Sequence, residues 1–127
     1  MSKPRDQRYT IAVDFDGVLH RYDSPWINEY TIPDLPVGGA LEWVAEMLAA
    51  GFDIVIFTTR GKTTAGRDAV HNWLVKHWKD APLLRLQVTA EKPPALVYLD
   101  DRAMRFDGPG TFPTAQQIHA ARPWNKR

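Results

Sequence analysis

The sequence predicts an α/β fold with a mainly parallel sheet, arranged as a three-layer sandwich. Short apolar segments rich in β-branched residues alternate with segments of helical periodicity, and this alternation is typical of parallel strands joined by helices. Each apolar segment also ends in polar side chains, at the edge where such sheets bind ligands. The length of 127 residues suits one domain spanning residues 1–127.

The first half of the chain contains two predicted strands and one helix. Tyr9 to Asp14 reads as a buried strand that stops before Gly17. Residues 20–36, with three prolines and three large aromatic residues, predict an irregular loop of a length that usually serves function. From Val37 to Gly51 the apolar residues recur at helical spacing, and residues 52–57 then predict the second strand.

The second half repeats this alternation. A helix is expected to begin near Thr63 or Thr64 and to continue to His77, followed by strands at 84–88 and 95–99. A last helix is expected around residues 114–121. A strand, a helix and a second strand in this order predict right-handed parallel crossovers.

Composition excludes several classes of function. The chain has 16 basic and 15 acidic residues, so its overall charge does not favour tight binding to nucleic acid or to an anionic membrane. Basic residues do gather at both ends, where solvated termini explain them as well as a binding arm does; they are Lys3, Arg5, Arg8, Arg122, Lys126 and Arg127. Cysteine is absent, which excludes disulfides, thiolate metal sites and cysteine nucleophiles. No apolar run is long enough for a signal peptide or a membrane span, so we expect a cytoplasmic protein that does not bind a membrane.

Carboxylates and a hydroxyl group end different predicted strands. Asp14 and Asp16 follow the first strand, Thr58 follows the second, and Asp100 with Asp101 follows the last. Parallel strands would bring these groups into one crevice, where clustered carboxylates raise one another's pKa or require a cation. Mg²⁺ prefers such oxygen ligands and commonly binds a phosphate oxygen as well, so the pattern favours phosphate chemistry.

The order of these motifs resembles the haloacid dehalogenase superfamily. Asp14–Leu19 (DFDGVL) is similar to the first signature of that superfamily and Thr58 to the second, while Lys92 before Pro93 and the Asp100–Asp101 pair are similar to the third and fourth. The resemblance covers most of the chain. It implies a Rossmann-like sandwich and a Mg²⁺-dependent phosphate monoester hydrolase.

The resemblance also implies a role for each residue. Asp14 would attack phosphorus and form an aspartyl-phosphate. Asp16 would protonate the leaving group and then activate water, a role that requires a raised pKa. Thr58 and Lys92 would bind the phosphoryl group. Asp16 also argues against dehalogenation, because the dehalogenases of the superfamily lack this acid.

Metal binding and substrate contacts follow from the same resemblance. The Asp14 carboxylate, the Asp16 backbone carbonyl and the Asp100–Asp101 pair would hold Mg²⁺, with Asp101 favoured as the direct ligand and Asp100 supporting it. Thr59 and Arg60 are secondary substrate-binding candidates, since Arg60 could grip a second phosphate or a carboxylate.

Plain structural roles remain open for each of these residues. Asp-x-Asp-Gly is also a common polar turn. Thr58 could cap a strand, and Lys92 and Arg60 could be solvated surface residues. Three aromatic residues of the 20–36 loop, Tyr22, Trp26 and Tyr30, could stack on a nucleobase or pack the loop onto the sheet.

The chain leaves little room for the cap domain that many superfamily members insert, so we expect a capless enzyme. An open crevice can admit the end of a macromolecule, or the second subunit of a homodimer can cover it, and the sequence leaves both open.

Three motifs resemble the phosphatase domain of polynucleotide kinases, namely Thr58-Thr59-Arg60, Lys92-Pro93 and Asp100–Ala103 (DDRA). The expected substrate is therefore a phosphorylated small molecule such as a nucleotide, or a nucleic-acid end. The alternatives are a catalytically idle binding or regulatory module and a phosphotransferase.

Overall fold

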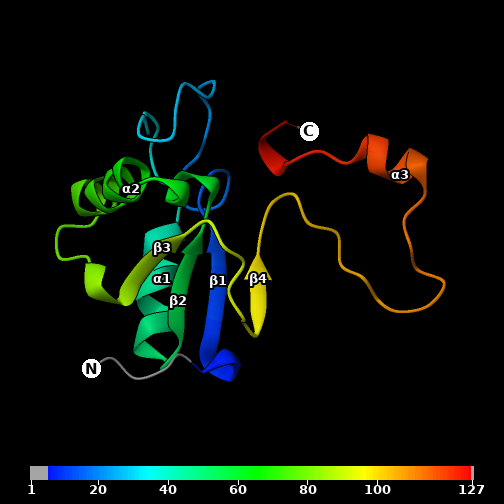
Figure 1. Ribbon diagram of the computed structural model, residues 1–127, viewed down its shortest axis with the longest axis horizontal. Coiled ribbons are helices and arrows are strands. Elements are labelled where there is room, and N and C mark those ends of the chain that lie inside the picture. Colours follow the sequence, from blue (N-terminus) through cyan, green and yellow to red (C-terminus); the bar gives the residue numbers. More distant parts are fainter. Residues whose placement is uncertain (1–5, 127) are drawn as a thin grey trace.

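The computed structural model describes residues 6–126 and contains one parallel four-stranded sheet (Figure 1). The strands are β1 (Thr10–Asp14), β2 (Asp53–Phe57), β3 (Leu86–Thr89) and β4 (Val97–Leu99), in the order β3-β2-β1-β4. Every neighbouring pair is parallel. The predicted α/β class with a parallel sheet is confirmed.

The three α-helices are α1 (Ala40–Ala49), α2 (Thr64–His77) and α3 (Ala115–Ala120), close to the predicted positions. After α1 the chain turns at Gly51, whose φ of 96° is in the left-handed region that glycine adopts readily. Thr63 caps α2 by accepting a hydrogen bond from Gly66 N. Within residues 6–126, none of the helices has the length and apolar character needed to cross a bilayer.

The last two strands are shorter than predicted. A 3₁₀ turn, Leu83–Arg85, occupies the start of the predicted third strand, directly after Pro82. The fourth strand begins at Val97 instead of residue 95. Prolines restrict the backbone and lack an N–H group for pairing, which accounts for the late start after Pro93 and Pro94. Of the basic residues at the chain ends, Lys3, Arg5 and Arg127 lie outside the described residues.

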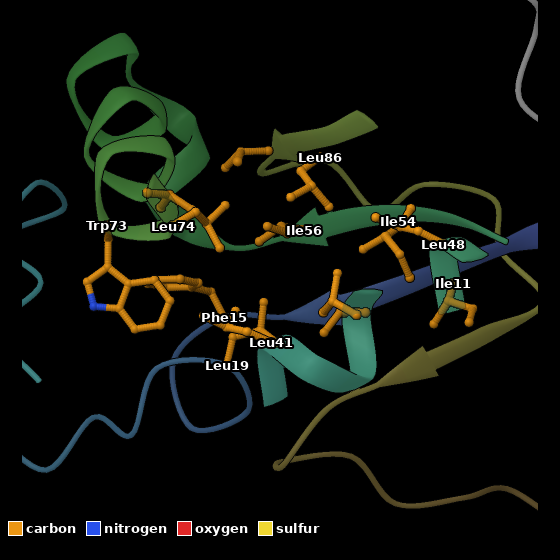
Figure 2. Close-up of a cluster of buried hydrophobic side chains, with 14 residues drawn as sticks. Ile11, Phe15, Leu19, Leu41, Leu48, Ile54, Ile56, Trp73, Leu74 and Leu86 are labelled. Atoms are coloured by element: carbon orange, nitrogen blue, oxygen red, sulfur yellow. The ribbon is translucent and has the colours of Figure 1, made fainter. Parts of the chain in front are cut away.

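Both α1 and α2 cover one face of the sheet. Ile11, Ile54 and Leu86 are neighbours in the strand register and share this face. They form a single core with side chains from both helices, including Leu41, Val44, Leu48, Val70, Trp73 and Leu74 (Figure 2). Two right-handed crossovers that step in the same direction place their helices on the same side, as observed.

The other face of the sheet has no helical layer in the described part of the chain. Ala12 and Val55 are buried there, and the extended segment 90–96 crosses this face on its way from β3 to β4, while α3 stands apart from the sheet (Figure 1). The structure therefore differs from the predicted three-layer arrangement. The reason is that only seven residues, 90–96, join β3 to β4, too few for a crossover helix.

The order in which the chain adds strands to the sheet reverses beside β1, between β1 and β4. The chain steps from β1 to β2 to β3 and then returns to the opposite side of β1. In open parallel sheets the crevice at such a switch point is the usual ligand site. Asp14 ends β1 and Asp100 follows β4, so the acidic residues lie on both sides of this point.

The loop of residues 20–36, called the flap below, rises above the carboxyl ends of the strands (Figure 1). Asp34 anchors its second half. The Asp34 carboxylate accepts hydrogen bonds from Ser24 N and Oγ at 2.8 and 2.7 Å, and its carbonyl accepts one from Trp73 Nε1 of α2 at 3.0 Å. Trp73 also packs against Phe15 with ring centroids 5.0 Å apart, so the core and the flap share this side chain (Figure 2).

Candidate functional site

A pocket of about 370 Å³ lies at the carboxyl edge of the sheet, beneath the flap. Its walls contain Asp14, Asp16, Tyr22, Trp26, Phe57, Thr58, Thr59, Asp100 and Arg102. The strand register explains the meeting of distant residues, because Asp14 is paired with Phe57 and Val13 with Leu99. A larger hollow of about 580 Å³ near the C-terminal segment contains, of the predicted site residues, only Asp101. The smaller pocket is therefore the candidate site.

Three carboxylates in or beside this pocket form a cluster suited to a metal ion. Asp14, Asp100 and Asp101 each offer an oxygen, and these oxygens all lie within 4.8 Å of one another. Asp101 Oδ1 is buried and accepts no hydrogen bond from the described residues. Hard divalent cations bind such oxygen sets, and an unpaired buried carboxylate oxygen is costly without a cation or donor. The residues present therefore fit a cation such as Mg²⁺.

Gly17 allows the Asp101 carboxylate to approach the loop that follows β1. Its φ is 89°, and a Cβ built at this position would meet Asp101 Oδ2 at 2.3 Å, far inside contact distance. Any side chain at residue 17 would therefore displace Asp101 or the loop. The glycine of the Asp-x-Asp-Gly motif therefore leaves space for the Asp101 carboxylate in addition to allowing the turn.

Asp14 is an unusual acid in this cluster. Burial, the charge of Asp100 and contact with Asp101 together raise the pKa of Asp14 to about 8, although a hydrogen bond from Phe15 N to Asp14 Oδ1 acts in the opposite direction. Without a cation Asp14 therefore keeps its proton at neutral pH. A bound cation would favour the fully ionised cluster.

Asp16 has the opposite electrostatic environment. Burial alone would raise the pKa of Asp16, but hydrogen bonds from His20 and Arg60 and the positive charge of Arg60 outweigh it, so the pKa lies below its ordinary value. The general-acid role expected for Asp16 required a raised pKa, and the structure does not provide one. The causes are the hydrogen bonds from His20 and from the buried Arg60, two partners that the sequence did not reveal.

Arg60 lies inside the molecule. Its side chain is buried, with 1% of its surface exposed, so the exposed surface arginine is wrong. Arg60 Nε donates to Asp16 Oδ2 at 2.9 Å, and Nη1 donates to three backbone carbonyls of the flap. These donors are used by the protein itself, and Arg60 is not among the residues that line the pocket, so its direct contact with substrate stays a prediction.

Some of the other predicted site residues line the pocket and one does not. Thr58 is buried at the end of β2, lines the pocket and accepts a hydrogen bond from Arg60 N at 3.3 Å, so it is both a cap and a pocket residue. Thr59 is exposed and lines the pocket. Lys92 is exposed and is not among the lining residues; its Nζ lies 4.7 Å from the centre of the Tyr98 ring. The structure thus brings Asp14, Asp16, Thr58 and the Asp100–Asp101 pair together, and leaves Lys92 apart.

Sequence reasoning missed His20. This histidine is fully buried, and its Nδ1 lies 2.8 Å from Asp16 Oδ1. Because Asp34 N donates to His20 Nε2 at 3.1 Å, that nitrogen carries no proton, and Nδ1–H of the neutral imidazole donates to Asp16. The one available signal was the spacing of His20, four residues after Asp16 at the start of the flap.

Arg102 also lines the pocket. It belongs to the Asp100–Ala103 motif, but its own position had not been singled out. Tyr22 and Trp26 line the pocket as well, whereas Tyr30 does not. Comparisons with protein-family models, with curated proteins and with solved structures found no match for this chain.

Proposed function

We propose that this protein is a Mg²⁺-dependent phosphate monoester hydrolase with a haloacid dehalogenase-like fold, in which Asp14 is the nucleophile. The observation that carries the proposal is the carboxylate cluster of Asp14, Asp100 and Asp101 within 4.8 Å, at the switch point of a parallel sheet. Asp14 also faces a pocket shared with Thr58. A carboxylate beside a cation site, next to a hydroxyl donor, suits in-line attack on phosphorus.

The proposed chemistry assigns a task to each residue. Asp14, Asp100 and Asp101 would hold Mg²⁺, which supplies charge neutralisation and polarises a phosphate oxygen. The Asp14 carboxylate attacks phosphorus and becomes an aspartyl-phosphate, while the bond from phosphorus to the ester oxygen breaks and the alcohol departs. The Thr58 hydroxyl donates a hydrogen bond to a phosphoryl oxygen. Arg102 is a further cation in the pocket wall and can stabilise the transferred group.

Asp16 fits the second half of the reaction better than the first. An ionised carboxylate can accept a proton from the water that cleaves the aspartyl-phosphate. To donate a proton to the leaving group, Asp16 would first have to lose its pairing with Arg60, which lowers its pKa. Leaving groups that depart without protonation, such as aryl oxides, are therefore expected to react faster than alkoxides.

A nucleotide or a nucleic-acid end is the proposed substrate class. Trp26 and Tyr22 stand in the same pocket as Asp14, and Trp26 keeps 46% of its surface exposed. An exposed indole near a phosphate site can stack on a base and bind it without regard to sequence. The near-neutral net charge of +1 favours a single nucleotide or a terminus over a long nucleic-acid strand.

A hydrolysis assay tests the function. Aryl phosphate and nucleoside monophosphates are incubated with the protein and Mg²⁺, or with EDTA. The expected result is phosphate release that needs Mg²⁺ and is lost in Asp14→Asn, while the matched control Asp53→Asn, at the opposite end of the sheet, keeps full turnover. Absence of turnover across the panel would refute the proposal.

A second measurement separates hydrolysis from phosphoryl transfer. A competing acceptor alcohol is added, and the products are analysed. Hydrolysis gives inorganic phosphate alone, whereas a phosphotransferase gives the phosphorylated alcohol. The open pocket favours hydrolysis, because excluding water usually needs a closed lid.

A further inference from the structure

Arg60 joins two parts of the molecule that are far apart in the sequence. On one side, its Nε and Nη2 donate to both carboxylate oxygens of Asp16, at distances of 2.9 to 3.2 Å. On the other side, Nη1 donates to the carbonyls of Asn28, Glu29 and Thr31 at 3.1, 3.0 and 3.1 Å. These three carbonyls belong to the middle of the flap.

The same guanidinium also orients Trp26. Its central carbon lies 4.4 Å from the centre of the Trp26 ring, which is stacking distance for a cation over an indole. Arg60 itself is buried beneath this ring, whereas Trp26 lines the pocket beside Asp14 and Asp16. The buried Arg60 guanidinium therefore packs against the face of Trp26, a side chain that forms part of the pocket wall.

The middle of the flap is attached separately from its second half. Asp34 is held by Ser24 and by Trp73 of α2, contacts that do not involve Arg60. Residues 28–31 form a local turn in which the Asn28 side chain accepts hydrogen bonds from Tyr30 N and Thr31 Oγ1. Loss of the Arg60 contacts should therefore release the middle of the flap while Asp34 stays in place.

We propose that Arg60 is a positioning residue that fastens the middle of the flap to Asp16 and so holds Trp26 as a wall of the pocket. A lysine cannot replace it, because one compact ammonium with three donors cannot reach the Asp16 carboxylate and three carbonyls on the other side together. The part of the proposal that concerns substrate binding rests on the proposed phosphatase function. The part that concerns the flap does not.

The test compares Arg60→Lys with Arg67→Lys. Arg67 is the matched control, since its guanidinium donates to the Gly61 carbonyl and to Thr64 Oγ1 and contacts neither the flap nor the pocket. Chymotrypsin cleavage after Trp26 and Tyr30 is followed under native conditions. Arg60→Lys should speed this cleavage about tenfold or more, because local opening depends on the contacts that hold the segment closed.

Kinetics and tryptophan fluorescence give two further readouts. Arg60→Lys should raise KM for a nucleotide about fivefold or more with a smaller change in kcat, as expected when a binding wall is loosened. Acrylamide should quench the tryptophan fluorescence of Arg60→Lys more strongly than that of the wild type. This difference in quenching should vanish when both proteins also carry Trp26→Phe. Arg67→Lys should leave cleavage, KM and quenching within about twofold of the wild type.

Trp26→Leu keeps the test decisive if Arg60→Lys does not fold, which circular dichroism would show. Trp26 is half exposed, so its replacement spares the core, and it should raise KM in the same way.

Flap cleavage at the wild-type rate in a folded Arg60→Lys protein would overturn the proposal, as would an unchanged KM in Trp26→Leu. A fall in kcat alone would also overturn it, because Arg60 would then act only through Asp16. If even the wild type shows no turnover, the phosphatase proposal fails, and flap cleavage and quenching still decide the role of Arg60.

Discussion

Replacing Asp14 by Asn should stabilise the metal-free protein. The pKa of Asp14 is raised from 3.8 to about 8, and a carboxyl group with a raised pKa favours the folded state at low pH. That contribution is fully present below pH 3.8 and is lost as the pH rises through about 8. At pH 7.5 the resulting cost of Asp14 to folding is at most about 5 kcal/mol, from 1.36 kcal/mol per pH unit above 3.8.

Asn would not recover this whole amount. Its amide is still buried beside Asp100 and Asp101 and carries a desolvation cost of about 1–3 kcal/mol. The expected net gain in the free energy of unfolding is therefore about 2 kcal/mol, which raises the melting temperature by about 5–10 °C for a chain of this size.

Thermal melts in EDTA and in Mg²⁺, at pH 5.5, 7 and 8.5, measure this effect. In EDTA the advantage of Asp14→Asn over the wild type should grow with pH, and in Mg²⁺ it should shrink or reverse because only the wild type binds the ion well. Asp53→Asn, at the exposed start of β2, is the control and should stay within about 0.5 kcal/mol of the wild type. Equal melting temperatures of Asp14→Asn and the wild type in EDTA at pH 8.5 would refute the reasoning.

Three further predictions follow from the carboxylate cluster and its surroundings. Titration calorimetry should show that Mg²⁺ binds about fiftyfold more weakly at pH 6 than at pH 8, because a carboxylate must lose its proton to bind a metal and the pKa of Asp14 is about 8. The same Mg²⁺ affinity at both pH values would contradict this. In the same assay Asp101→Asn should weaken Mg²⁺ binding by about a hundredfold and Asp100→Asn by less, since Asp101 Oδ1 is the buried oxygen without a donor; the reverse order would make Asp100 the main ligand. In urea denaturation Gly17→Ala and Gly39→Ala should each lose about 1–2 kcal/mol from their positive φ. Only Gly17→Ala should also lose Mg²⁺ binding, because only its Cβ meets the Asp101 carboxylate; normal binding in that variant would show that the loop yields instead.

Local patterns were enough to predict the sheet and the acids at its edge. The apolar run before Asp14 forms β1, and the run before Thr58 forms β2, because buried parallel strands need continuous apolar residues. Once the strands are parallel, their carboxyl ends must meet. The clustering of Asp14 with the Asp100–Asp101 pair is therefore a consequence of topology that the sequence could predict.

The partners of long side chains could not be predicted in this way. Arg60 meets Asp16 across 44 positions and the flap carbonyls across 29 to 32 positions. No periodicity encodes such contacts, because they depend on how an irregular loop lies over the sheet. For the same reason Lys92 was expected near the phosphate site, whereas the short β3–β4 connection directs it to Tyr98.

Four aspartates at the flap and in the carboxylate cluster fall into two electrostatic groups, and the difference bears on the proposed function. Asp16 and Asp34 accept hydrogen bonds from His20, Arg60 and Ser24, and both have a lowered pKa. The fold itself satisfies these carboxylates, which hold the flap. Asp14 and Asp101 are placed against each other instead, with a raised pKa at Asp14 and a buried oxygen without a donor at Asp101. Such an arrangement is costly without a further partner, and a divalent cation, as in the function proposed above, would provide one.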